Sequence, residues 1–185
     1  MNTLVSLYNS AFGLLERATD GWLTPTLARL VFAGTLLVYY WASALTKLGD
    51  GIFGFLFPSP GAYIQIFPKA VEAAGYDTSQ LGFFHWLVVL LGTYAEFLLP
   101  LMIVIGLLTR AAALGMIGFV IVQSWVDITG HGLAAKDIGA WFDRDPSSLI
   151  VDQRSFWIFL LLVLVLKGAG PFAADRFVLN RKSDA

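Results

Sequence analysis

Glu96 is the residue of this sequence with the clearest chemical potential, because it stands alone in a long apolar run. The run extends from Phe83 to Leu108 and holds no other carboxylate. Its length is enough to cross a hydrocarbon core of roughly 30 Å as a helix, which places Glu96 near the middle of the membrane. Because a buried ionisable group is costly there, Glu96 is either a protonated carboxyl bonded to a neighbouring helix or a site for a proton, an ion or a cofactor.

The residues around Glu96 would form a pocket along this predicted helix. Gly92, one turn earlier, lets a second helix or a flat ligand approach the same face, and Thr93 and Tyr94 add hydroxyl groups. Pro100, one turn later, has no amide hydrogen for the carbonyl of residue 96, so a kink is expected there. The pattern therefore indicates a carboxylate-centred, glycine-bearing pocket.

A second polar group is expected near one mouth of the helices. His85, Asp127 and His131 would gather there with Lys47, and together they would form one end of a proton path to Glu96. As metal ligands they are weak candidates, because two histidines and one aspartate at this spacing are not diagnostic. No metal is predicted.

The composition is that of an integral membrane protein. Of the 185 residues, 57% are hydrophobic and 14% are charged, and the mean hydropathy is +0.72, whereas soluble domains have about a quarter of charged residues. The absence of cysteine excludes disulfides, iron–sulfur clusters and thiolate metal sites within the chain. A net charge of −1 gives no reason to expect nucleic-acid binding, and redox chemistry would need a borrowed cofactor.

The hydrophobic pattern predicts an all-α, four-helix, up-down bundle forming a single domain over residues 1–185. The spans are expected at about residues 26–46, 83–108, 111–128 and 155–170. Thr109 and Arg110 would form a tight connection that makes the second and third spans antiparallel neighbours. Two long loops, residues 48–82 and 132–154, would join the other spans. A short surface helix is expected from Tyr63 to Ala74, and most of the charges of the second loop are expected to be solvated.

Two features outside the spans leave alternatives open. Residues 1–19 have apolar side chains spaced by three and four, which predicts an amphipathic helix lying either in the membrane interface or against the bundle; no removable signal peptide is seen. Lys47 follows the first span and is interpreted as snorkelling to the headgroups, with pairing to an acid across the bundle as the alternative.

The distribution of tryptophan and basic residues predicts the orientation. Trp41, Trp86, Trp125 and Trp157 would share one interface, and the short segments at the opposite side carry more concentrated positive charge. Both termini are therefore predicted to be cytoplasmic.

Three stretches of this sequence resemble the DoxX family of small bacterial four-helix membrane proteins. They are Arg29 with Lys47-Leu48, then AEFLLPLMIVIGLLTRAAAL from Ala95, and KGAGPFAADRF from Lys167. Gly168, Gly170 and Asp175 belong to the last of these. The family often has a serine two residues before that aspartate, where this chain has Ala173, which removes a potential capping hydroxyl.

The resemblance implies a place in the bacterial cytoplasmic membrane and a link to redox complexes, because the family looks related to membrane subunits of thiosulfate:quinone oxidoreductases. On that analogy Glu96, Lys47 and Arg110 are the positions to test, Glu96 and Lys47 being the catalytic candidates. A bound quinone is the expected cofactor, with none intrinsic to the chain. Its expected contacts are Glu96, Gly92, Thr93, Tyr94 and His85.

Three functions are therefore considered. The first is a subunit or anchor of a membrane redox complex, working with a periplasmic or membrane redox partner; at most it would be the membrane subunit of a quinone-linked oxidoreductase. The second is a non-enzymatic scaffold or assembly factor. The third is a small proton- or ion-coupled transporter subunit, which would need to form a homo-oligomer because four spans are few.

Overall fold

The computed structural model describes residues 2–179, and within them the chain is helical without strands. Four helical segments have the length and apolar character of membrane spans: Leu23–Leu45, Phe83–Ile105, Thr109–Thr129 and Leu149–Lys167. The four predicted spans are therefore present, and the chain is a multi-pass membrane protein.

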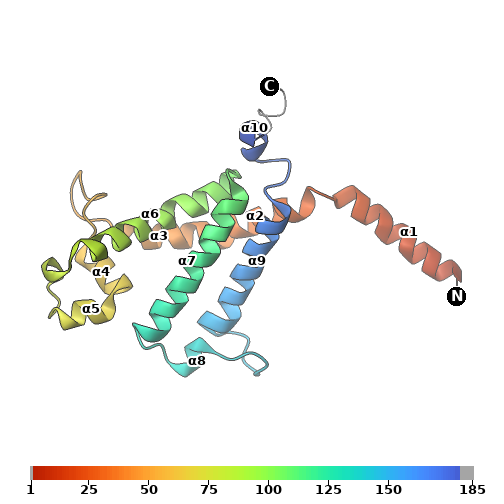
Figure 1. Cartoon of the computed structure of the whole chain (residues 1–185). Coiled ribbons are helices and arrows are strands. Elements are labelled where there is room, and N and C mark those ends of the chain that lie inside the picture. The colour runs from red at the N-terminus through yellow and green to blue at the C-terminus, as the bar shows by residue number, and fades with distance from the viewer. Residues whose placement is uncertain (1, 180–185) are drawn as a thin grey trace.

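The four spans pack around one another in their order in the sequence, and the fourth span also contacts the first. The first span consists of α2 (Leu23–Phe32), a π-helical segment (Ala33–Leu37) and α3 (Val38–Leu45). Its first half packs on α9 (Arg154–Lys167) and its second half on α6 (Phe83–Ile105), while α7 (Thr109–Thr129) lies between α6 and α9 (Figure 1). The core between them includes Phe32, Tyr40, Ile103, Met116 and Leu161, all fully buried.

The turn between α6 and α7 comes earlier than predicted. The expected connection was Thr109-Arg110, but α6 ends at Ile105 and α7 begins at Thr109. Gly106 takes a left-handed conformation with φ of 74°, which glycine adopts without steric cost. The carboxylate of Asp175 accepts hydrogen bonds from the amides of Leu108 and Thr109, so it caps α7 from a distant part of the sequence.

Arg29 holds the same end of the molecule together. Its guanidinium donates to the carbonyls of Ile103 and Val104 at the end of α6, and to those of Ala169 and Phe172 after α9. Carbonyls in the last turn of a helix lack the usual amide donor four residues later, and Arg29 supplies donors to two of them in α6 while it also binds the segment after α9. With Asp175, which begins α10 (Asp175–Leu179), Arg29 forms the terminal clamp.

The fourth span also differs from its predicted bounds of 155–170. It begins with a π-helical segment (Leu149–Gln153), which continues into α9 and ends at Lys167. Ser148 and Asp152 cap its start, since each side chain accepts the other residue's amide hydrogen. Gly168, with φ of 77°, ends it. This capping extends the helix in the N-terminal direction beyond the purely apolar residues.

The loops contain several short helices. The predicted helix from Tyr63 to Ala74 is divided into α4 (Pro60–Ile66) and α5 (Pro68–Ala73), because a proline disfavours helical conformation in the residue before it. Gly75 follows with a positive φ, as expected for a helix stop. A 3₁₀ turn (Thr78–Gln80) precedes α6, and α8 (Ala135–Ile138) lies between α7 and α9.

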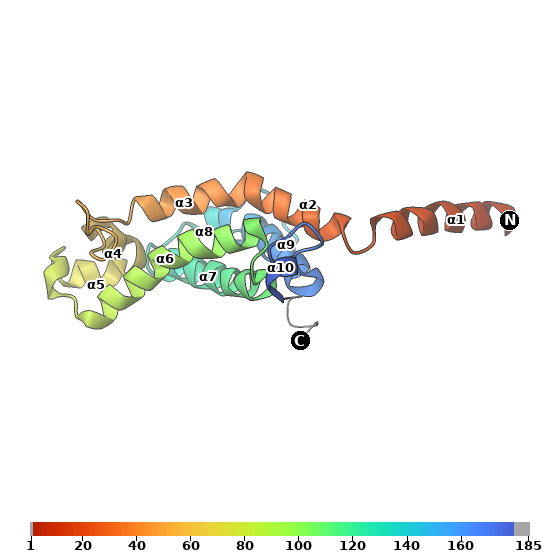
Figure 2. The same ribbon diagram turned by 90° about the horizontal axis from the view of Figure 1, so that it is seen from above.

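The N-terminal helix α1 (Asn2–Thr19) extends away from the spans (Figure 2). Its apolar side chains, including Leu4, Leu7, Tyr8 and Leu15, are more than half exposed. The structure therefore does not support the alternative in which this helix packs against the bundle. Burial of the apolar stripe in a membrane surface remains a prediction.

We expect Gly106→Ala to destabilise the protein by about 1–3 kcal/mol, because a side chain is strained at this φ and its Cβ would lie 2.5 Å from that of Ala173. Gly34→Ala is the matched control, since Gly34 is helical and a Cβ there meets nothing within 4 Å. Unfolding of both variants in detergent micelles measures the difference. Equal stability of the two variants would contradict the role given to Gly106.

Candidate functional site

Lys47 and Glu96 form an ion pair inside the protein. The Lys47 ammonium lies 2.8 Å from one oxygen of the Glu96 carboxylate and 3.0 Å from the other, and it donates to the Ser43 hydroxyl at 2.7 Å. The two residues are only 3% and 5% exposed. The interpretation of Lys47 as a snorkelling residue is therefore wrong, and the alternative of an acid partner across the bundle is correct.

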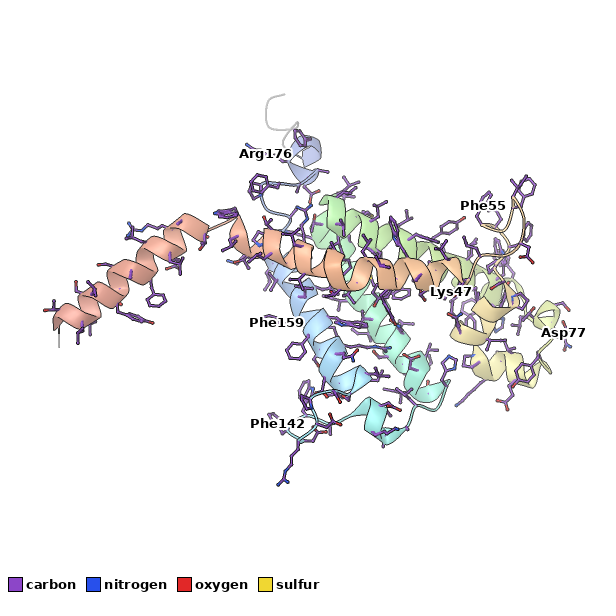
Figure 3. The ribbon with its side chains drawn as sticks, turned by 180° about the vertical axis from the view of Figure 1, so that it is seen from behind. Lys47, Phe55, Asp77, Phe142, Phe159 and Arg176 are labelled. Atoms are coloured by element: carbon purple, nitrogen blue, oxygen red, sulfur yellow. The ribbon has the colours of Figure 1, made fainter. Side chains whose placement is uncertain are left out.

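The ion pair lies on the wall of a cavity of about 560 Å³. The cavity is bounded by α3, α6 and α7, and the last two helices diverge from their shared turn (Figure 1). Gln65 and Ile66 of α4 close one end. Figure 3 marks Lys47 where α3 ends, close to these loop helices.

Glycines on two helices make room for this cavity. Gly92 of α6 and Gly115 and Gly118 of α7 all contribute to its wall. A methyl group at Gly115 would lie 3.3 Å from the Leu99 side chain, whereas one at Gly118 would meet nothing within 4 Å. Gly92 was predicted to permit close approach of a ligand near Glu96, and the structure places it in the cavity.

The cavity has an apolar opening on the outside of the spans. Leu91 of α6 and Val122 of α7 line it and are each 59% exposed. Since these residues belong to membrane-spanning helices, the surface beside them faces lipid.

Tyrosine and glutamine side chains form a second hydrogen-bonded group beside the cavity. Gln123 of α7 donates from its amide nitrogen to the Tyr39 hydroxyl at 3.1 Å and accepts from the Tyr40 hydroxyl at 3.3 Å. Tyr39 and Gln123 line the cavity, whereas Tyr40 is fully buried behind them. The cavity thus has hydrogen-bonding groups both at the ion pair and at Tyr39 and Gln123.

A second ion pair joins α7 to α9 near the loop end. Arg154 donates to the Asp127 carboxylate and, at 2.8 Å, to the Ser124 hydroxyl, and it lies 6.0 Å from the centre of the Trp157 ring. Arg154 is buried, so its inclusion among the solvated loop charges is corrected. The sequence offered one indication, since Asp127 near the end of one span and Arg154 at the start of the next lie at the same side.

Of the other charges in the second loop, Lys136, Asp143, Arg144 and Asp145 are exposed, as predicted. Asp145 is exposed and accepts hydrogen bonds from the amide and hydroxyl of Ser147, which lower the pKa of its carboxyl. Asp77 has the same arrangement with Ser79, and its pKa is lowered for the same reason. These carboxylates fix local turns and lie outside the cavity.

Three of the proposed ligand contacts lie outside the cavity. Thr93 bonds its hydroxyl to the carbonyl of Val89, one turn earlier in the same helix, and Tyr94 donates to the carbonyl of Phe55 on the other side of α6. His85 packs between the rings of Phe67 and Phe84. Only Glu96 and Gly92, of the five contacts suggested for a quinone, line the cavity.

The three candidate metal ligands, His85, Asp127 and His131, each contact a different group. His131, which follows the end of α7, contacts the Gln65 carbonyl at 3.0 Å, Asp127 pairs with Arg154, and His85 is held by aromatic rings. Within residues 2–179 no three histidine or carboxylate side chains are close enough to hold a metal ion. Asp127 and His131 do line the cavity near Lys47. Arg110 lies at the opposite end of α7, next to Gly168.

A family model of DoxX matches residues 24–127, which is more than half of the chain. The chain belongs to the DoxX family. The matched region contains both members of the Lys47–Glu96 pair and the glycines of the cavity wall, so the candidate site lies within the DoxX domain. The search of curated proteins and the search of solved structures give no match.

We expect the Lys47–Glu96 pair to show strong energetic coupling. Lys47→Met or Glu96→Leu alone should destabilise the protein by about 3–5 kcal/mol, because each leaves one charged group buried without its partner. The double variant should cost less than either single variant, since no uncompensated charge remains. Unfolding in detergent measures all four proteins.

Lys69→Met is a suitable control, because Lys69 is exposed and should change stability by less than about 0.5 kcal/mol. Additive effects of the two single variants would mean that the pair is not coupled.

Proposed function

We propose that this DoxX protein is a membrane subunit of a redox complex that binds a quinol in the cavity beside Lys47 and Glu96. The observation that carries the proposal is a buried ion pair on the wall of a cavity that is also lined by exposed apolar residues of two membrane-spanning helices. Quinols move within the bilayer and have an apolar tail and a polar ring, which suits a site entered between α6 and α7.

The hydrogen-bonding capacity that remains in the site favours the reduced ligand. An ammonium group has three donors, and those of Lys47 are directed to Ser43 and Glu96. The Glu96 carboxylate keeps unused lone pairs, since a carboxylate has about four acceptor positions. A ligand next to Glu96 must therefore supply a hydrogen-bond donor, as a quinol hydroxyl does and a quinone carbonyl does not.

The ligand, when bound, would supply two electrons and two protons. Glu96 would accept a hydroxyl hydrogen bond and then one of these two protons. Lys47 fixes the position of the carboxylate and balances its charge in the low-dielectric interior. Tyr39, two turns before Lys47 on the same helical face, and Gln123 of α7 would have hydrogen-bonding capacity for the second ring oxygen.

The complex would also need a redox protein partner. The chain has no cysteine and only two histidines, so it does not supply an iron–sulfur cluster or a pair of bis-histidine haems from its own residues. Electrons would pass between the bound quinol and a periplasmic or membrane partner. On this proposal the DoxX protein resides in the bacterial cytoplasmic membrane with both termini cytoplasmic.

We expect native mass spectrometry of the gently solubilised protein, mixed with decylubiquinol under argon, to detect the bound quinol. Glu96→Gln should weaken binding by about tenfold or more, because a hydrogen bond to a charged group contributes about 1.5–3 kcal/mol. Gly118→Leu should abolish binding, since the new side chain would occupy the cavity without meeting other atoms at its Cβ.

Gly34→Leu is the matched control for the cavity-filling variant. Gly34 is also a helical glycine with open space around it, but it does not line the cavity, so quinol binding should be unchanged. If the wild-type protein binds no quinol, and if the same partner proteins co-purify with the wild type and with Glu96→Gln, the scaffold hypothesis would be favoured. Proton or ion uptake into proteoliposomes that is lost in Glu96→Gln would favour the transporter.

A further inference from the structure

The loop between α3 and α4 has an unusual surface. Between Leu48 and Ser59 the only ionisable residue is Asp50. Five large apolar side chains of this loop are exposed, with Ile52 at 87%, Phe57 at 65% and Phe53 at 63%, and Phe55 and Leu56 somewhat less. An aqueous loop is expected to be polar, so these side chains need another environment.

The loop is attached to the side of α6. The Tyr94 hydroxyl donates to the Phe55 carbonyl at 2.9 Å, and the Trp86 ring nitrogen donates to the Leu56 carbonyl at 3.1 Å. Tyr94 is eleven residues after the first residue of α6, about 16 Å along the helix axis. The loop therefore lies beside the membrane-spanning part of α6, as Figure 3 shows for Phe55.

The face of α6 that holds the loop is turned toward lipid. Tyr94, Leu98 and Leu101 are spaced by four and three residues, so they share one side of the helix. Leu98 is 52% exposed and Leu101 is 37% exposed, and both belong to a membrane span. The loop continues this lipid-facing surface outward.

Two glycines allow the loop to fold so tightly. Gly49 donates its amide hydrogen to the Gly54 carbonyl at 3.0 Å. A Cβ on Gly54 would lie 1.9 Å from the Gly49 carbonyl oxygen, and one on Gly49 would lie 2.0 Å from that of Phe57. A side chain fits at neither position, so both glycines are required for this compact shape.

We propose that residues 49–57 form a membrane-inserted loop, which enters and leaves the bilayer on one side and places its apolar side chains among the acyl chains. Its base is joined to the candidate site, because the Ser59 amide donates to the Lys47 carbonyl at 2.9 Å and the Ser59 hydroxyl to the Thr46 carbonyl. Insertion of the loop thus fixes the end of α3 that presents Lys47. This inference does not depend on the ligand of the cavity.

Site-directed spin labelling tests the proposal directly, because the chain has no cysteine of its own. A nitroxide is attached to Phe53→Cys in full-length protein in phosphatidylcholine–phosphatidylglycerol liposomes. A label on Leu98→Cys of α6 gives the reference for a site in lipid. A label on Arg144→Cys, at an exposed residue of the second long loop, gives the reference for a site in water. Frequent collisions of the nitroxide with oxygen indicate that it lies in lipid, and frequent collisions with a water-soluble nickel chelate indicate that it lies in water.

We expect the label at residue 53 to match that at residue 98, with frequent oxygen collisions and few nickel collisions. A profile like that at residue 144 would overturn the proposal in favour of an aqueous loop. Protection from both reagents would overturn it in favour of a protein partner or a second copy of the chain.

A double variant tests the attachment of the loop to α6. Tyr94→Phe combined with Trp86→Phe removes both hydrogen bonds and retains the aromatic rings, and nickel collisions at residue 53 should then increase. Tyr8→Phe is the control, since this tyrosine lies on α1, away from the loop. Circular dichroism verifies that the helices are intact in every variant. An unchanged label profile in the double variant would show that these two bonds do not hold the loop.

Discussion

The buried ion pair between Lys47 and Glu96 is the constraint on which the candidate site depends. A charge in a low-dielectric interior is tolerated only when an opposite charge and further hydrogen bonds compensate it. Lys47 meets this condition through Glu96 and Ser43. The pair therefore requires α3 and α6 to remain in contact at this level, and any change in the position of one helix exposes a charge to apolar surroundings.

The two ends of the DoxX fold are built differently. At the short turn Arg29 and Asp175 bind backbone groups of α6, α7 and the segment after α9, which holds the spans close together. At the other end α6 and α7 are separated by the cavity, and short loop helices cover the gap. The bundle thus has one end held together by contacts to the backbone and one end where a cavity lies between its helices.

The long loops contribute to this open end more than their composition alone suggests. α4 closes the cavity with Gln65 and Ile66, and His131 contacts the Gln65 carbonyl from the end of α7. Arg154, at the start of the last span, joins that span to α7 through Asp127. The loops thus set the shape of the site and the spacing of the helices around it.

The sequence by itself determined that this is a four-span membrane protein with a carboxylate in the second span, because hydrophobic length and a lone intramembrane charge are local properties. It also located Gly92 beside Glu96, through helical spacing alone. The tertiary structure decided the partner of Glu96, since Lys47 precedes it by 49 residues and both snorkelling and pairing fitted the local pattern.

The tertiary structure likewise decided where the helices end and which side chains line the cavity. The turn at Gly106 is stabilised by Asp175, a capping contact between distant segments that no local pattern contains. Thr93 and Tyr94 adjoin Gly92 in sequence, yet one bonds within its own helix and the other holds the loop outside. A helix turns by about 100° per residue, so neighbours in the sequence face different surroundings, and packing determines which of them meets the cavity.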